Sequence, residues 1–212
     1  MNSKCVRVGS VIPVNCYIVG DDGAKVPFLA VIDPGDDPDV IASQLPAAPT
    51  HIIITHCHFD HIGALAPLHD RYPSARIAVG ESEDRDPERI LSDIKSVLGS
   101  FFRYTAYAKN GCILPEPDIL LRDSDRIGPF TVLFTPGHTK GSICLYSEKD
   151  KVLYSGDTLF RHSYGRTDLP GGSDEQMAHS LKRLLHLDPD ITVYPGHDES
   201  TLIGDEQLYF NF

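Results

Sequence analysis

Residues 55–64, THCHFDHIGA, crowd three histidines and an aspartate into six consecutive positions. The first of these histidines, His56, directly follows HIIIT at 51–55, an apolar and β-branched run that predicts a buried strand. Side chains two residues apart in an extended chain point the same way, so His56 and His58 should project together, with Cys57 turned away. Open α/β folds place their sites just past the carboxyl ends of strands, where these ligand-type side chains lie.

Asp60 and His61 extend this cluster as the chain turns toward a predicted helix. They can face His56 and His58 from a second direction. One carboxylate and three imidazoles exceed what a single tetrahedral zinc ion needs once ligands from elsewhere are added. A polar loop rich in histidine is the alternative interpretation. The strand geometry favours a metal site, and the number of ligands hints at two ions.

Three more ligand-type side chains each follow a strand and a turn: His138 in TPGHTKGS, Asp157 in YSGDTLF and His197 in YPGHDES. Together with the first four they make seven ligands, enough for two adjacent metal ions that share one carboxylate. That number is typical of a binuclear hydrolase. The remaining histidines lack such spacing, and we expect surface or core roles for His51, His69, His162, His179 and His186.

Strands and helices are predicted along the whole chain. The first 35 residues predict short strands joined by turns, among them DDG at 21–23. Later strands are predicted at 51–55, 76–80, 130–134, 142–146, 151–156 and 191–196. Capping residues and prolines predict helices at 37–45, from near Leu65 to Arg71, after Asp86, and from Ser173 to about His186. We expect 81–126 to be an excursion near the site.

Composition and charge limit the class of protein. With 212 residues, 41% of them hydrophobic, the chain can bury a core, and we expect a single domain over 1–212. A formal net charge of −11 disfavours nucleic acid, because phosphate binding needs clustered Lys and Arg. No apolar run approaches the roughly 18–20 residues of a membrane span, and the start lacks a signal pattern. We therefore expect a cytoplasmic protein with no membrane partner.

The cysteines offer no redox motif. They are odd in number and widely spaced, without a CxxC pair. Because disulfides are improbable in the cytoplasm, we expect reduced core thiols at Cys5, Cys16, Cys57, Cys112 and Cys144.

The ordered motifs H-x-H-x-D-H, a later His, a later Asp and a final His resemble those of the metallo-β-lactamase superfamily over nearly the whole chain. The resemblance implies an α/β (α+β) fold, an αββα sandwich of two mixed sheets flanked by helices, with metals at one sheet edge. It also divides the ligands between two metals: His56, His58 and His138 for one, Asp60, His61 and His197 for the other, and Asp157 bridging. Asp33 in VIDPG is similar to the aspartate that supports the family's ligands from behind.

Within the superfamily, the chain most resembles the glyoxalase II-like hydroxyacylglutathione hydrolases. The matching stretches are VIDPGDDP, THCHFDHIGA, TPGHTKGS, GDTLFRHSYGRTD and PGHDEST. β-Lactamases usually place Cys or Ser where Asp157 stands, oxygen-reducing relatives place Glu where His58 stands, and nucleases generally carry extra domains and basic surface. Because only a short segment follows His197, we expect a single-domain member without the C-terminal helical region that helps glyoxalase II bind glutathione.

The expected substrate contacts are Arg161, Tyr164 and Arg166. Arg166 matches the family's basic contact to glutathione, whereas Asp168 and Glu199 stand where tyrosines are usual. The alternative is that Arg161, Tyr164 and Arg166 only stabilise a turn.

These features together predict a binuclear metal-dependent hydrolase that cleaves a thioester such as a hydroxyacylglutathione. A metal-bound hydroxide would attack the thioester carbonyl, with Asp60 and Asp157 as the catalytic carboxylates. The expected cofactors are two divalent ions, zinc first, with iron or manganese as alternatives. The expected partner is a small-molecule thioester, and the oligomeric state is left open.

Two other classes of function stay open. One is a persulfide dioxygenase, in which His56, His138 and Asp157 would hold a single iron and oxidise glutathione persulfide. The chain also resembles that group. The other is a metal-binding module without catalysis. Hydrolysis of another ester, a lactone or a phosphoester ranks below thioester hydrolysis.

Overall fold

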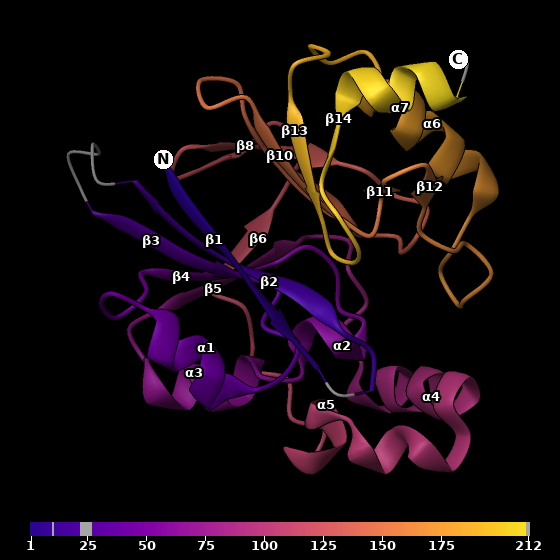
Figure 1. Ribbon diagram of the computed structural model, residues 1–212. Coiled ribbons are helices and arrows are strands. Elements are labelled where there is room, and N and C mark those ends of the chain that lie inside the picture. Colours follow the sequence, from indigo (N-terminus) through magenta and orange to yellow (C-terminus); the bar gives the residue numbers. More distant parts are fainter. Residues whose placement is uncertain (10, 22–26, 211–212) are drawn as a thin grey trace. The chain divides into compact units, whose positions relative to one another are not determined.

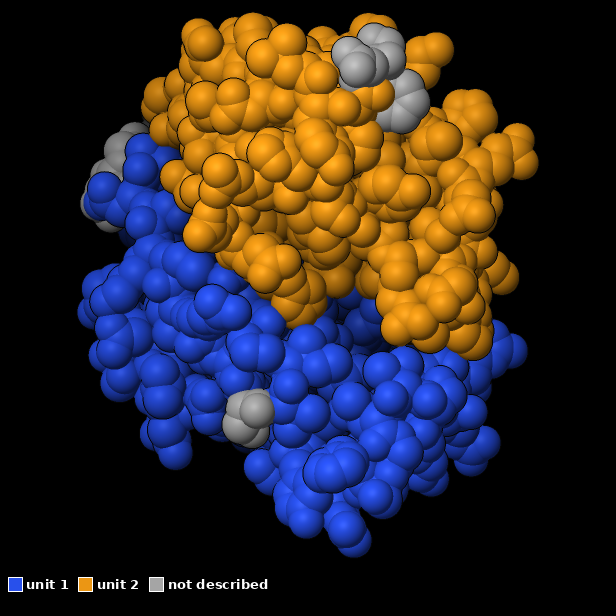
Figure 2. Space-filling model, turned by 45° about the vertical axis from the view of Figure 1, so that its right-hand side comes forward, with its two compact units in different colours: residues 1–79, 85–120 blue, residues 80–84, 121–212 orange. Residues whose placement is uncertain are grey.

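The computed structural model describes residues 1–9, 11–21 and 27–210. The chain divides into two compact units, residues 1–79 with 85–120 and residues 80–84 with 121–212 (Figure 2). We refer to them as the first and the second unit. Of the turn expected at DDG, residues 22 and 23 lie outside the described residues.

The first unit is built on a six-stranded mixed sheet of strand order β1-β2-β3-β4-β5-β6 (Figure 1). Its strands are β1 (Asn2–Val8), β2 (Val14–Asp21), β3 (Phe28–Ile32), β4 (His51–Ile54), β5 (Arg76–Gly80) and β6 (Ile119–Leu121). β1 and β3 pair antiparallel with β2, whereas β3, β4 and β5 run parallel. The isoleucines of β4 are all buried, as expected of a strand in the parallel part of a sheet.

Helices of the first unit pack their apolar side chains against this sheet. They are α1 (Pro38–Gln44), α2 (Phe59–Ile62), α3 (Leu65–Arg71), α4 (Pro87–Leu98), the 3-10 helix Gly99–Tyr104 and α5 (Ala106–Lys109). Ile41 of α1, Leu68 of α3 and Ile94 of α4 join one hydrophobic cluster with Ile52 and Ile77 of the sheet. In Figure 1, α1 and α3 lie side by side. The helices predicted at 37–45 and 65–71 are confirmed.

The caps of these helices differ from one another. Asp86 caps α4 as predicted, because its carboxylate accepts a hydrogen bond from the Glu88 amide at 3.0 Å. Asp37 was predicted to cap α1, and this is wrong for its side chain. Its backbone is left-handed, with φ 49°, and its carboxylate accepts from the Gly9 amide at 3.3 Å instead.

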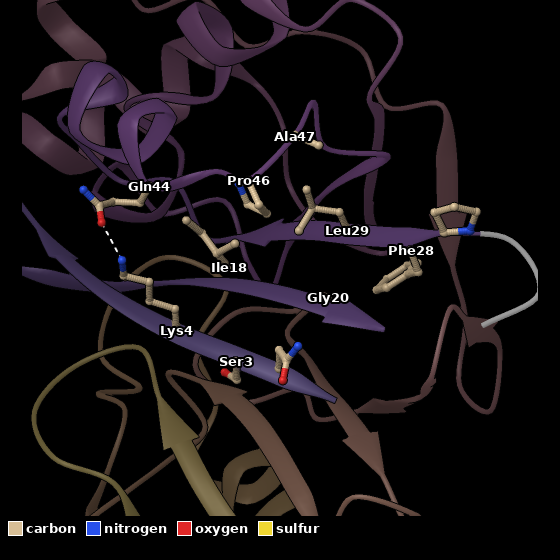
Figure 3. A pocket seen from close by; sticks show the side chains of 11 residues that line it. Ser3, Lys4, Ile18, Gly20, Phe28, Leu29, Gln44, Pro46 and Ala47 are labelled. Atoms are coloured by element: carbon tan, nitrogen blue, oxygen red, sulfur yellow. Dashed lines mark hydrogen bonds between the residues drawn. The ribbon is translucent and has the colours of Figure 1, made fainter. Parts of the chain in front are cut away.

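A groove of about 650 Å³ lies in the first unit beside β1, β2 and β3 (Figure 3). Ile18, Phe28 and Leu29 form part of its apolar lining. Lys4 Nζ donates to Gln44 Oε1 at 2.5 Å, and both residues line the groove (Figure 3). Its described lining contains none of the predicted metal ligands.

The second unit is built on another six-stranded mixed sheet, of order β14-β13-β10-β9-β8-β7. Its strands are β7 (Arg126–Ile127), β8 (Phe130–Phe134), β9 (Ile143–Ser147), β10 (Val152–Gly156), β13 (Thr192–Pro195) and β14 (Thr201–Leu202). β10 and β13 pair parallel, and the other neighbours pair antiparallel. A small hairpin of β11 (Leu159–Phe160) and β12 (Ser163–Tyr164) follows β10.

Two helices belong to the second unit, α6 (Asp174–Leu184) and α7 (Ile203–Phe210) (Figure 1). Ser173 caps α6 as predicted, because its hydroxyl accepts from the Gln176 amide at 3.3 Å. Leu181 of α6 and Ile203 of α7 pack in one cluster with Leu153 of the sheet. The predicted strands agree with β4, β5, β8, β9, β10 and β13 to within a residue or two at each end.

The sequence analysis missed the short strands β6, β7, β11, β12 and β14, and it missed α7. Strands of two or three residues are too short to show a period-two pattern. Helix α7 is stabilised by one local and one long-range contact of its buried Glu206, which accepts from nearby Thr201 Oγ1 at 2.6 Å and from the distant His162 amide at 2.8 Å. Local sequence carries no signal for the long-range contact.

Among the described residues, we find no helix with the length and apolarity that crossing a membrane requires.

Ile52 tests the packing of the first unit. Its side chain is fully buried in the centre of the sheet, between Val31 of β3 and Ile77 of β5. We expect Ile52→Ala to lower the free energy of unfolding by about 2–5 kcal/mol, because it leaves a cavity. Leu208→Ala, at a side chain that is 79% exposed, should change it by less than about 0.5 kcal/mol. Urea unfolding followed by circular dichroism measures both, and equal effects would contradict the assigned core.

Candidate metal centre

The first unit brings together four of the predicted ligands at the end of β4. His56 and His58 follow the strand, and Asp60 and His61 lie on α2, which begins directly after His58. Ligand atoms of His56 lie within 4.8 Å of those of His58 and of His61. Asp60 Oδ2 is 4.0 Å from His61 Nε2. The expectation that the second pair faces the first is therefore met for His61, whose ligand atom lies near that of His56.

Asp33 forms a hub behind these histidines. Its buried carboxylate accepts hydrogen bonds from the Thr55 amide at 2.7 Å and the Thr55 hydroxyl at 2.6 Å. The same carboxylate lies 3.0 Å from His61 Nδ1. Thr55 Oγ1 in turn lies 3.2 Å from Nδ1 of His56. Because the Thr55 hydroxyl hydrogen is given to Asp33, its oxygen is the acceptor for His56, and one carboxylate orients two imidazoles.

Cys57 turns away from the ligands, as the alternation predicted, and packs in the hydrophobic cluster of the first unit. Cys16 and Cys144 are also buried, and burial raises the pKa of both thiols, for Cys144 to about 11. Their thiol groups therefore stay protonated at neutral pH. The prediction of a core thiol is wrong for Cys5, which is exposed. It holds only in part for Cys112, which is half-buried. All five cysteines lie within the described residues, and none of them forms a disulfide.

The second unit brings together the other three predicted ligands. His138 follows β8, Asp157 follows β10 and His197 follows β13. Since β8 and β13 both run in the direction of β10, the carboxyl ends of all three strands meet at one edge of the sheet. Asp157 Oδ2 lies 3.6 Å from His138 Nε2 and 3.4 Å from His197 Nε2.

The His138 ring is held by backbone that approaches it closely. Its Nδ1 lies 2.7 Å from the carbonyl oxygen of Arg166, so the Nδ1–H donates there. Gly165 permits this approach, because a Cβ at that position would lie 1.9 Å from the carbonyl oxygen of Asp157 and 3.0 Å from His138 Nδ1. A larger residue at 165 would displace one of these two ligands.

The hydrogen bonds of His56, His61 and His138 fit a metal site. Each ring engages its Nδ1 with an oxygen of the protein: a hydroxyl, a carboxylate and a carbonyl, respectively. A neutral imidazole that donates from Nδ1 carries its lone pair on Nε2. Metal-bound histidines are oriented by the same kind of bond to carboxylate or carbonyl oxygen. The donor set, imidazole nitrogens with carboxylates, suits zinc and iron.

The predicted substrate contacts lie on and after the β11–β12 hairpin of the second unit. Arg161 forms an ion pair with Glu199, and both side chains are exposed. Tyr164 is half-exposed, with its ring 6.2 Å from that of Phe210. The hairpin also carries His162, whose ring stacks on Tyr209 at 4.7 Å.

Arg166 makes a bidentate ion pair that the sequence analysis did not predict. Its Nε and Nη2 each donate to a different oxygen of Asp168 at 2.7 Å. The guanidinium group holds the pKa of Asp168 down to about 2, so the pair stays charged at neutral pH. The exposed Arg166 side chain therefore already has an anionic partner where the family resemblance expects glutathione.

Part of the predicted excursion lies next to the ligand helix α2 in the first unit. Asn110 Nδ2 donates to the Gly63 carbonyl at 2.7 Å, and Gly63 directly follows α2. Thr105 and Ala106 line a cavity of about 10 Å³ that Asp60 also lines. That space is about large enough for one water molecule.

Three supporting residues escaped the sequence analysis: Thr55, Glu83 and Glu206. Glu206 and Glu83 are buried carboxylates, and each has a hydrogen-bond partner that lies far away in sequence. No local sequence pattern indicates such hydrogen-bonded pairs. Thr55 was counted only as the last residue of a strand, although its place directly before His56 was a usable signal.

Known proteins resemble this chain over nearly its full length. The model of the metallo-beta-lactamase superfamily matches residues 9–197. An uncharacterized protein of Aquifex aeolicus is 36% identical, with 99% of this chain and 95% of that protein covered. The hydroxyacylglutathione hydrolase GloC of Haemophilus influenzae is 29% identical, with 93% of each covered.

Solved structures agree with these relatives. TTHA1623 in a di-iron-bound form is 33% identical, with a TM-score of 0.76 and 96% of each chain covered. The BLEG-1 B3 metallo-beta-lactamase is 33% identical, with a TM-score of 0.74 and 97% of this chain and 96% of that one covered. ETHE1 from Myxococcus xanthus is 27% identical, with a TM-score of 0.72 and coverage of 99% and 83%.

These likenesses confirm the predicted fold class, a mixed α/β chain with two mixed sheets and helices of the metallo-β-lactamase type. The family match spans the His/Asp motifs of both units. The chain therefore belongs to the metallo-β-lactamase superfamily, whose fold is that of metal-dependent hydrolases.

Proposed function

We propose that this protein is a binuclear metal-dependent thioesterase that hydrolyses a hydroxyacylglutathione or a closely related thioester. The observation that carries the proposal is the set of Nδ1 hydrogen bonds that prepares Nε2 of His56, His61 and His138 for metal binding. The likeness to GloC, named as a hydroxyacylglutathione hydrolase, supports the substrate class.

In this proposal the seven ligands that the family resemblance indicates divide between two ions. His56, His58 and His138 would hold one ion, Asp60, His61 and His197 would hold the other, and Asp157 would be shared. Zinc is the first candidate because imidazole and carboxylate ligands suit it. Iron is the alternative, since TTHA1623 binds two irons.

The residues around the ions have separate roles. When bound, divalent ions lower the pKa of a coordinated water toward neutrality and polarise a carbonyl oxygen. The carboxylate of Asp60, on α2, accepts a hydrogen bond from the attacking water and orients it. Asp33 keeps His61 and, through Thr55, His56 in their binding orientation. Asp157 offsets the charge of the two cations.

The hairpin of the second unit would contact the thiol part of the substrate. Arg166 offers a planar guanidinium that suits a carboxylate of glutathione. Its bond to Asp168 is exposed, so a substrate carboxylate can exchange with it at small cost. Tyr164 and Arg161 extend this surface along the hairpin.

A second candidate function is iron-dependent oxidation of a glutathione persulfide. The di-iron form of TTHA1623 supports iron as the metal, because it shows that a relative of similar length binds iron. His56, His138 and Asp157 would then provide two imidazoles and one carboxylate to a single iron. A β-lactam is a further substrate to test, given the likeness to BLEG-1.

Metal analysis combined with a substrate panel separates these candidates. We expect protein purified without added metal to contain two metal equivalents and to release thiol from a hydroxyacylglutathione without consuming oxygen. The panel also contains a lactone, a phosphoester, a β-lactam and glutathione persulfide. One iron with oxygen uptake on the persulfide would overturn the hydrolase proposal. Bound metal with no turnover on any substrate would support a non-catalytic module.

Asp157→Asn tests the shared carboxylate. Asn keeps the size of the side chain but loses the negative charge, so it is a poor bridge between cations. We expect at least one metal to bind more weakly and thioester turnover to fall by on the order of a hundredfold or more. The matched control is Asp190→Asn, at an exposed aspartate that pairs with Lys151. Retention of both metals and near-parental turnover in Asp157→Asn would show that the bridge is assigned wrongly.

Asp168→Asn tests the role of Arg166. Removal of the competing carboxylate frees the guanidinium for substrate, so KM for a glutathione thioester should fall by about two- to fivefold with kcat unchanged. Arg166→Ala should raise KM. Steady-state kinetics on both variants measure this, and the proposal for Arg166 fails if KM moves in neither.

A further inference from the structure

Glu83 is a buried carboxylate that the proposed mechanism does not use. It lies in the short segment 80–84, which follows β5 in sequence and belongs to the second unit. Its side chain is only 8% exposed, although the neighbouring Glu81 is exposed and pairs with Arg122. A carboxylate is costly to bury unless hydrogen-bond donors surround it.

Two hydrogen-bond donors to the Glu83 carboxylate come from the loop that carries His138. Thr139 Oγ1 donates to Glu83 Oε2 at 2.7 Å, and the Gly141 amide donates to the same oxygen at 3.0 Å. Thr139 and Ser142 are joined by a further hydroxyl contact of 2.7 Å. One carboxylate oxygen therefore fixes the chain one and three residues after His138.

Two glycines let this loop approach the segment at backbone distance. A Cβ on Gly141 would lie 2.2 Å from the Glu83 amide nitrogen, and a Cβ on Gly80 would lie 2.2 Å from the Gly141 carbonyl oxygen. The contact therefore leaves no room for a side chain on either glycine. Such close packing makes the loop position depend directly on the segment that holds Glu83.

The residues before His138 are fixed by α6 rather than by Glu83. The Ser173 amide donates to the Gly137 carbonyl at 2.8 Å, and Ser180 Oγ donates to the Pro136 carbonyl at 2.7 Å. The His138 ring itself donates to the Arg166 carbonyl. Glu83 therefore supplies the anchor on the C-terminal side of the ligand.

We propose that Glu83 is a positioning residue for the metal that His138 binds, because its carboxylate anchors the loop at Thr139 and Gly141. This inference rests on the proposed function, since it assumes that His138 is a metal ligand. Hydrogen bonds to an ionised acceptor are shorter and stronger than neutral ones, so a carboxylate holds the loop more firmly than a neutral side chain. A ligand that is already in place binds its metal more tightly.

The test is a titration of metal-free protein with Zn²⁺ in competition with a chelator. We expect two equivalents in the parent protein. In Glu83→Ala, the affinity for the metal that His138 binds should fall by about tenfold, which is the lower end of the effect of mutating residues that support metal ligands. The affinity for the other metal should stay nearly unchanged. Glu83→Gln keeps an acceptor oxygen and should restore most of the affinity. Co²⁺ absorption spectra should change for one site only.

Glu81→Ala is the matched control, because it removes an exposed carboxylate two residues away from Glu83. It should leave both affinities unchanged. If Glu83→Ala does not fold, Thr139→Val removes the shorter of the two bonds with a side chain of similar shape and should weaken the same equivalent.

Three results would overturn the inference. Unchanged affinities in folded Glu83→Ala would remove the positioning role. Equal loss at both sites, together with a lower urea midpoint, would show a merely structural role. Absence of metal binding in the parent protein would overturn the proposed function itself, and this outcome is distinct from the first two.

Discussion

The carboxylate of Asp33 is the interaction on which the ligand set of the first unit depends. Asp33 directly follows β3, and the parallel pairing of Ile32 with Ile53 brings it beside Thr55 at the end of β4. There it accepts from two groups of Thr55 and from His61. Its left-handed backbone, with φ 52°, directs the chain away from the strand just at this point. Sheet register, and not the loop itself, therefore decides where the histidines point.

The second unit reaches a similar result by a different route. Its ligands come singly, from three strands whose carboxyl ends share an edge, and each is separated from the next by an entire hairpin or helix. Backbone groups take the place of the Asp33 carboxylate, since the Arg166 carbonyl orients His138. The glycines at 137, 141 and 165 make this possible, because each allows another part of the chain to pass where a Cβ would collide.

The sequence predicted elements with strong local signals, and it failed where long-range contacts decide. Strand β4 contains three consecutive isoleucines and β10 begins with Val-Leu-Tyr, and α4 and α6 have a capping residue with a clear partner, so their positions were predictable. The ligands were found because they follow such strands. Glu83 and Glu206 were not found, because a buried glutamate looks like any surface glutamate until its distant partners are known. The Arg166–Asp168 pair was missed for a different reason, because two side chains this near in sequence meet only if the backbone between them has a suitable conformation.

The buried carboxylates fall into two kinds, and the difference bears on where cations bind. Asp33, Glu83 and Glu206 accept hydrogen bonds from amide or hydroxyl groups of the protein. Asp157, in contrast, lies 3.6 Å from Nε2 of His138.

The His138 ring already donates from Nδ1 to the Arg166 carbonyl, so its neutral form presents a lone pair at Nε2. A lone pair and a carboxylate attract each other only through a cation that both can bind, either a proton on the imidazole or a metal ion. His197 Nε2 lies 3.4 Å from the same carboxylate oxygen, so a second imidazole nitrogen faces Asp157. In the proposed binuclear site, one ion at His138 and another at His197 would each also bind the carboxylate of Asp157, which would satisfy all three groups.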